Sequence, residues 1–156
     1  KTGGMEITMS FAEDRIKYQD VMELNPPASE QQIKNWEEKY QWKIPGEYRS
    51  FLLKHNGGEI YIPGLVLLGV EPVADWCDMA EQNSSVCRGS FDADYLVIGR
   101  TNYGNLIGIY TGTEQTVETC NFVEWDTETQ EAIKYWDTLE ELLQREREIY
   151  VEWLNK

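Results

Sequence analysis

The chain has 156 residues, 41% of them hydrophobic and 12% aromatic, and its 28 acidic side chains outnumber 14 basic ones. The length favours one domain with an ordinary buried core, because domains commonly run to about 100–200 residues. The formal net charge of −14 argues against nucleic acid and anionic membranes as partners, since both repel a protein of the same sign. The charge suits a basic protein partner or simple solubility.

The acidic excess is concentrated toward the end of the chain. Residues 114–156 hold 12 acidic and 4 basic side chains, a net of −8, whereas residues 1–113 hold 16 and 10, a net of −6. Two interpretations stay open at this point. The excess is a solvated acidic surface, or it is a docking face for a cationic partner.

Cysteine usage and the lack of targeting signals favour a cytoplasmic protein. Cys77, Cys87 and Cys120 are an odd number without a CxxC pair, which is a poor basis for a disulfide framework or a zinc site. We therefore expect reduced thiols. No apolar stretch approaches the roughly 18 residues of a membrane span, and no basic start with an apolar run marks a secretory signal. Export without a cleaved signal stays open.

Residues 5–156 are expected to form a single domain. Residues 1–4 precede Met5 and contain no initiator methionine, so we leave them out of the fold as a candidate cloning remnant. No internal repeat and no low-complexity tract divides the remainder.

The first part of the chain has the apolar spacing of helices. Phe11 to Leu24 is predicted to be one helix, which Asn25-Pro26-Pro27 ends because proline cannot continue the helical backbone. Ser29 followed by Gln32 fits a capping box, which predicts a second helix from Glu30 to Tyr40.

A third helix is predicted to begin at Pro45, where the missing N–H costs nothing. Tyr48, Phe51 and Leu52 give it a buried stripe. Asn56-Gly57-Gly58 is expected to end it, because glycine readily takes the left-handed conformation of a C-cap.

Beyond residue 58 the hydrophobic period changes from 3.6 to 2, which indicates strands. Strands are predicted at 59–62, 65–70, 95–100, 106–111 and 122–125, with an edge strand at 132–136. The turn at 102–105 joins two of them into a hairpin. Residues 71–93 read as an irregular excursion with one short helix, and such excursions are often functional.

The last helix has the clearest pattern in the chain. Thr138 followed by Glu141 is a second capping box. The apolar residues that follow share one face: Leu139, Leu142, Leu143, Ile149, Tyr150 and Trp153. We therefore predict an α+β fold, with N-terminal helices, a central mostly antiparallel sheet and a C-terminal helix packed on the sheet.

No catalytic, cofactor or metal site is predicted. His55 is the single histidine, and its expected place in the last turn of a helix is one that the helix dipole favours. Without another histidine, nucleophilic hydrolysis and a histidine-based metal site lack their usual groups. Glu37-Glu38 and Glu140-Glu141 are neighbours on helices and do not face each other. An enzyme would need carboxylates that converge across the fold in a deep pocket, with raised pKa values.

Trp76 is the candidate anchor for a protein partner. It lies in the irregular segment with Asp75, Asp78 and Glu81, and tryptophan inside an acidic rim suits an interface with a basic partner. The alternative is that Trp76 plugs the end of the core under its own loop. Three other tryptophans are expected in the core, because they fall on helix stripes or on a strand: Trp36, Trp125 and Trp153.

An ordered set of residues across most of the chain resembles a known family. The first part of the set is Ser29-x-x-x-Ile33-x-x-Trp36-Glu37, Ile44-Pro45-x-x-Tyr48-Arg49-x-Phe51-Leu52 and Asn56-Gly57-Gly58. The second part is Asp94-Tyr95-Leu96-Val97-Ile98-Gly99, Gly104, Val123-Glu124-Trp125-Asp126 and Thr138-Leu139-x-Glu141-Leu142. In combination these residues resemble the SUKH superfamily, which includes fungal cell-wall-synthesis regulators and bacterial toxin-immunity proteins.

The resemblance implies an α+β fold and a role in binding instead of catalysis. It implies no catalytic residues, since the motif glycines and aromatics look like turn and core positions. It further implies a cytoplasmic immunity protein that binds and neutralises a cognate toxin. Combined with the net charge of −14, it suggests that the toxin domain is basic. The alternative is a regulatory scaffold of cell-wall synthesis or signalling. The oligomeric state stays open.

Overall fold

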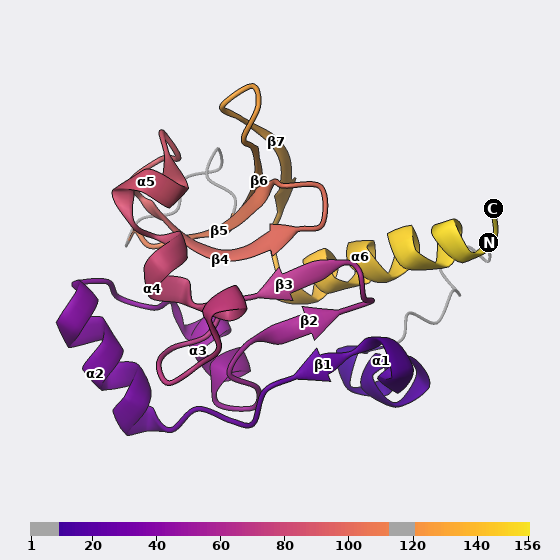
Figure 1. Ribbon diagram of the computed structural model, residues 1–156, viewed down its shortest axis with the longest axis horizontal. Coiled ribbons are helices and arrows are strands. Elements are labelled where there is room, and N and C mark those ends of the chain that lie inside the picture. The colour runs from indigo at the N-terminus through magenta and orange to yellow at the C-terminus, as the bar shows by residue number, and fades with distance from the viewer. Residues whose placement is uncertain (1–9, 113–120) are drawn as a thin grey trace.

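A meander of antiparallel strands organises the chain in the computed structural model, which describes residues 10–112 and 121–156 (Figure 1). The strands are β1 (Glu23–Leu24), β2 (Gly58–Ile60), β3 (Leu65–Leu67), β4 (Tyr95–Thr101), β5 (Leu106–Tyr110), β6 (Phe122–Asp126) and β7 (Glu131–Trp136). They form one seven-stranded sheet in the order β1 to β7, so each strand pairs with its neighbour in sequence. The predicted hairpin is β4 with β5, and β7 is the predicted edge strand.

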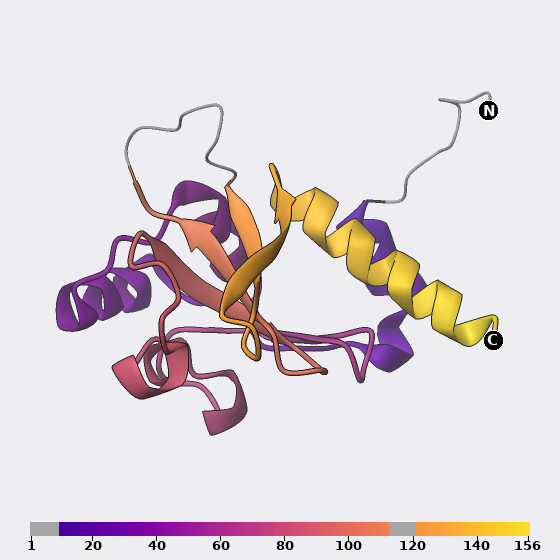
Figure 2. The ribbon, with the colours of Figure 1, turned by 90° about the horizontal axis from the view of Figure 1, so that it is seen from above.

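Helices cover both faces of this sheet. They are α1 (Phe11–Lys17), α2 (Glu30–Tyr40), α3 (Gly46–Leu52), α4 (Met79–Gln82), α5 (Ser85–Arg88) and α6 (Leu139–Leu154). Figure 2 shows α6 on one side of the sheet and α4 with α5 on the other. α6 contacts α1 and β7, which confirms the predicted α+β fold with a C-terminal helix against the sheet. Because both faces are covered, β4 reads as a nearly continuous buried run.

The predicted capping boxes begin their helices as expected. In α2 the Ser29 Oγ accepts from the Gln32 N–H at 3.1 Å, and the Gln32 Oε1 accepts from the Ser29 N–H at 2.7 Å. The helix then spans the predicted residues. Thr138 and Glu141 cap α6 in the same way. These local bonds satisfy N–H groups that a helix start otherwise leaves unpaired.

The single helix predicted from Phe11 to Leu24 is wrong. α1 ends at Lys17, a 3₁₀ turn follows, and residues 23–24 form β1. β1 pairs with β2, and it approaches so closely that a Cβ on Gly58 would clash with the Glu23 carbonyl oxygen. This long-range pairing satisfies the backbone of residues 23–24, so the apolar spacing there does not extend the helix.

The glycine C-cap predicted for the third helix is also wrong. α3 ends at Leu52, and its C-cap Leu53 is right-handed. Gly57, with a φ of 80°, lies instead in the turn into β2, where a Cβ would clash with the Leu67 carbonyl. His55 therefore lies beyond the helix, although its N–H still donates to the Phe51 carbonyl at 2.8 Å.

Two of the three tryptophans expected in the core pack there. Trp36 is buried, and Trp125 is partly buried against the core. Trp153 is 60% exposed, so its predicted core position is wrong. The last turns of α6 extend past the strands of the sheet (Figure 1).

Residues 71–93 hold three short helices where one was expected. They are a 3₁₀ turn at Asp75–Cys77, then α4 and α5. Cys77 is buried and Cys87 is exposed, both as free thiols. Cys120 and residues 1–4 lie outside the described residues. Across residues 10–112 and 121–156, no helix has the length and apolar character needed to span a membrane.

Asn56 joins three parts of the fold through its side-chain amide and its main-chain carbonyl. Its Nδ2 donates to the Val70 carbonyl at 2.7 Å, and its Oδ1 accepts from the Val70 N–H at 2.8 Å. Its main-chain carbonyl accepts from the Asn25 Nδ2 at 2.8 Å. Asn56 is buried, so the side chain replaces water for two buried backbone groups.

We expect Asn56→Ala to lower the free energy of unfolding by about 3 kcal/mol, because it leaves both Val70 backbone groups buried without partners. Urea unfolding measures the change. The control is Asn35→Ala, because Asn35 is exposed and, among the residues described, its side chain bonds only with Gln31. It should change stability by less than about 0.5 kcal/mol. Equal losses in the two variants would contradict this role of Asn56.

Candidate functional site

The segment predicted to bind a partner brings its acidic side chains together. Asp75, Asp78 and Glu81 line one cleft of about 200 Å³. Gln82, Cys87 and Arg100 complete its lining. We call it the acidic cleft. Trp76, on the same turn as Asp75, is 37% exposed and does not line the cleft.

One side of the acidic cleft, at residues 75–79, is hydrogen-bonded to Gly69, just beyond the end of β3. The Gly69 N–H donates to the Cys77 carbonyl at 2.8 Å, and the Met79 N–H donates to the Gly69 carbonyl at 3.0 Å. Asp78 caps α4, where its Oδ1 accepts from the Ala80 N–H at 3.0 Å. The residues that follow Trp76 are therefore hydrogen-bonded to Gly69, just beyond β3.

The far side is fixed to β4 by Asn83. This amide donates to the Val97 carbonyl at 2.9 Å and accepts from the Val97 N–H at 2.8 Å, as a neighbouring strand would. The Arg88 guanidinium donates to Asn83 and to the Tyr95 carbonyl, at 2.9 and 2.7 Å. It also lies over the ring of Trp42, 5.1 Å from the centroid. Arg88 is buried, so its charge supports the fold and is not presented at the surface.

The carboxylates of the acidic cleft are poorly compensated. Asp75 and Glu81 are exposed, and within the described part of the chain their carboxylates accept no hydrogen bond and form no ion pair. Arg100 is the one basic residue in the lining. Among the residues described, no group of three or more His, Cys, Asp or Glu is arranged to hold a metal ion. What the cleft offers is negative charge toward solvent.

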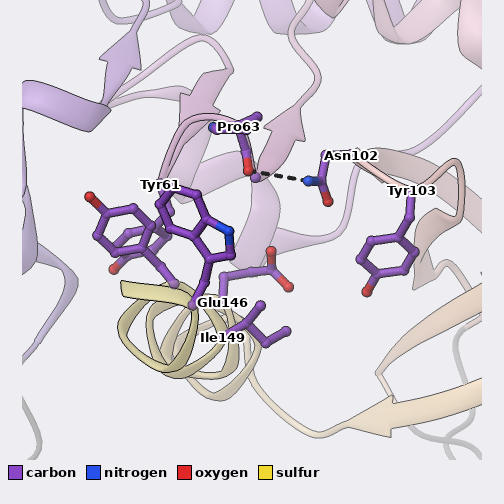
Figure 3. Close-up of a pocket in the computed structure, with 9 residues that line it drawn as sticks. Tyr61, Pro63, Asn102, Tyr103, Glu146 and Ile149 are labelled. Carbon is purple, nitrogen blue, oxygen red and sulfur yellow. Dashed lines mark hydrogen bonds between the residues drawn. The ribbon is translucent and has the colours of Figure 1, made fainter. Parts of the chain in front are cut away.

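A second depression, of about 150 Å³, was not predicted from the sequence (Figure 3). It lies between α6 and the turns that follow β2 and β4. Its lining is Tyr61, Pro63, Gly64, Asn102, Tyr103, Glu146, Ile149, Tyr150 and Trp153. The Asn102 Nδ2 donates to the Pro63 carbonyl at 3.3 Å, which joins the two turns. We call it the Glu146 pocket.

Glu146 is the acidic residue of this pocket. It is only 7% exposed, and Figure 3 shows its carboxyl extending from α6 toward the turn that holds Asn102 and Tyr103. No other residue in the described ranges gives this carboxyl a hydrogen bond or an ion pair. Burial, and then the negative charge of Glu124, raise the pKa of Glu146 to about 7.

Glu124, on β6, lies behind the pocket and, unlike Glu146, accepts hydrogen bonds. Its Oε2 accepts from the Asn105 Nδ2 at 2.9 Å and from the Tyr103 hydroxyl at 3.1 Å. Burial and the Glu124 carboxylate raise the pKa of Tyr103, which keeps that hydroxyl a donor. Glu124 does not line the pocket. Glu146 is therefore the one acidic residue that this pocket presents to a ligand.

Sequence reasoning missed Glu146 although a signal was present. Glu146 follows Leu142 and Leu143 on the apolar stripe of α6 and precedes Ile149, at helical spacing. An acid on a buried stripe is unusual, because a carboxylate away from water is costly unless it is paired. The rest of the pocket comes from two distant turns, which no local pattern connects.

The fold and these two sites define an α+β domain with acidic surface depressions on a meander sheet. The chain belongs to the SMI1 / KNR4 family (SUKH-1), whose family profile matches residues 27–145. This confirms the resemblance seen in the sequence. The family includes immunity proteins, is generally non-catalytic, and its members typically bind protein partners.

The chain is also similar to the uncharacterized protein YnaB of Bacillus subtilis (strain 168). The two are 32% identical over 73 residues, which is 47% of this chain and 44% of that relative. The match therefore spans less than half the length of YnaB.

We expect the stability of the protein to fall as pH rises through the pKa of Glu146. The folded value is about 7 against an ordinary 4.5, so between these pH values the folded state holds the extra proton. The free energy of unfolding should therefore be about 3 kcal/mol lower at pH 8 than at pH 4.5, because ionising Glu146 costs more in the folded state than in the unfolded chain. Glu146→Gln should then be more stable than the parent at pH 8 and similar to it at pH 4.5.

Urea unfolding at several pH values measures this difference. The groups that act on Glu146 are Glu124 on β6, Lys134 on β7 and Arg145 on α6, and all three stay in place in the variant. Glu152→Gln, an exposed change on the same helix, is the control and should keep the parent's pH dependence. If Glu146→Gln also keeps the parent's pH dependence of stability, burial does not penalise the ionised form of Glu146 as expected.

Proposed function

We propose that this chain is an immunity-type protein that binds a cognate toxin in the cytoplasm and neutralises it. The proposal treats residues 5–156 as one binding domain. It would act stoichiometrically, by covering the toxin's active site or a surface that the toxin needs. Membership of a family that includes immunity proteins supports this role.

The observation that carries the proposal is the poorly compensated negative charge of the acidic cleft beside an exposed tryptophan. Asp75 and Glu81 face solvent on a backbone that is tied to β3 and β4. Trp76 adds an exposed aromatic surface on the same segment. A rigid acidic rim with an aromatic anchor suits a basic protein surface.

The chemistry of the cleft favours a basic toxin domain. A nuclease, for example, has a basic active site that binds phosphates, and the carboxylates here would take the place of those phosphates. The net charge of −14 also favours fast association with such a partner, since opposite charges steer the encounter.

A regulatory scaffold for cell-wall synthesis or signalling is the second candidate. The family match favours it equally, because that match does not separate the immunity members from the regulators. The two candidates differ in their partners. A scaffold would bring down proteins of its own cell, whereas an immunity protein would bind the product of a toxin gene beside its own.

Co-expression with the toxin encoded by a neighbouring gene tests the proposal. We expect cells to survive only when this chain is present, and the two purified proteins to form a complex at micromolar concentration or below. No rescue and no complex at that concentration would contradict the immunity role.

Replacing Trp76 by Ala should weaken the toxin complex by more than about 1 kcal/mol, or roughly fivefold in Kd, because an aromatic anchor is lost. Stability should change little, since Trp76 is already 37% exposed. Tyr135→Ala, an exposed aromatic on β7, is the matched control and should bind like the parent. A loss of stability with unchanged affinity would instead show that Trp76 packs against the core and does not contact the partner.

The association rate should fall steeply as salt is added, because screening removes the attraction between the acidic cleft and a basic partner. The double variant Asp75→Asn, Glu81→Gln should associate more slowly and depend less on salt. Stopped-flow binding measures both quantities. A rate that is independent of salt in the parent would assign the acidity to solubility alone.

A further inference from the structure

We propose that the Glu146 pocket binds one cationic side chain, an arginine or a lysine, of a protein partner. This inference rests on the proposed function in one respect, that the partner is a basic protein. The Glu146 pocket is separate from the acidic cleft, because α6 lies on the opposite side of the sheet from α4 and α5 (Figure 2).

The buried carboxyl of Glu146 is the first reason. It is 7% exposed, points into the pocket, and has no hydrogen-bond or ion-pair partner among the residues that the structure describes (Figure 3). The Glu146 oxygens are not among the fully enclosed, unpartnered side-chain atoms of the described residues, so they keep some contact with solvent in the pocket. A carboxylate held mostly out of water without a protein partner is still unfavourable. The fold gives two donors to Glu124 and none to Glu146. A guanidinium or ammonium group entering the pocket would supply the missing partner.

The aromatic rim is the second reason. Trp153 is 60% and Tyr103 is 54% exposed, and Tyr150 also lines the pocket. Cations are attracted to the faces of such rings. The aliphatic stem of an arginine or lysine can pack on Ile149 and Pro63 while its charged end reaches inward. Exposed Trp and Tyr are also the side chains enriched at protein interfaces.

Charge and size exclude other ligand classes. Glu124 adds a second negative charge behind Glu146, which disfavours an anion. One carboxyl facing the pocket is too few oxygen ligands for Ca²⁺ or Mg²⁺, which take about six or more. A space of about 150 Å³ accommodates the end of one side chain and not a folded element of a partner.

The α6 side of the pocket lies beyond the family match. That match ends at residue 145, whereas Glu146, Ile149, Tyr150 and Trp153 follow it. The acidic cleft lies inside the matched range. The turns that complete the pocket, with Tyr61 and Tyr103, lie inside the matched range as well.

The test is an NMR titration of the full chain at pH 8 with capped tripeptides, acetyl-Gly-Arg-Gly-amide and acetyl-Gly-Lys-Gly-amide. We expect at least one of them to shift the Trp153 indole N–H signal, which Trp153→Ala identifies, with a Kd on the order of millimolar. The citrulline peptide, a neutral isostere of the arginine peptide, should bind at least tenfold more weakly.

Glu146→Gln should reduce the affinity for the cationic peptide about tenfold or more, and Glu152→Gln should leave it unchanged. Lowering the pH to 5.5 should weaken binding by a similar factor in the parent, because the ionised pocket becomes a minor population. The variant Glu146→Gln should not show this pH effect.

Several results would overturn the assignment. These are no shift with either cationic peptide, equal binding of the citrulline peptide, or full binding by Glu146→Gln. Spermidine binding tighter than either peptide would assign the pocket to a free polyamine instead of a protein side chain. None of these results involves a toxin, so failure here is distinct from failure of the co-expression test, which addresses the proposed function.

Discussion

The cost of burying a polar group without a hydrogen-bond partner is the constraint on which this structure depends. Helices cover both faces of the sheet, so chain segments that leave it must bring their own partners. Asn56 and Asn83 do this, because each amide pairs with both backbone groups of one residue, Val70 and Val97 respectively. The start and the middle of the 71–93 excursion are thereby fixed, on either side of its carboxylates.

The same constraint separates the two buried glutamates of the second site. Glu124 receives hydrogen bonds from Asn105 and Tyr103, whereas the described fold offers Glu146 none. Glu146 opens onto a pocket instead, where a ligand can reach its carboxyl. Local departures of this kind are concentrated where a protein contacts something else. Glu146 thus carries more information about binding than the many solvated carboxylates do.

Sequence patterns predicted what depends on neighbours in the chain and failed where distant segments meet. The Ser29 capping box placed the start of α2 correctly at Glu30, since its bonds span three residues. The helix predicted through Leu24 failed because β1 pairs with Gly58 across the sheet. The acidic cleft was within reach, because its three acids lie within seven residues of chain. The Glu146 pocket was not, since it needs α6 and two remote turns.

The two sites bear differently on the two candidate roles. An immunity protein needs one face that covers its toxin. A scaffold that holds two proteins at once needs two faces that do not compete. The acidic cleft belongs to the side of the sheet with α4 and α5, and the Glu146 pocket to the side with α6 (Figure 2). A partner with one convex surface reaches one of them, which leaves the other free. The number of partners that bind together therefore separates the roles more directly than affinity does.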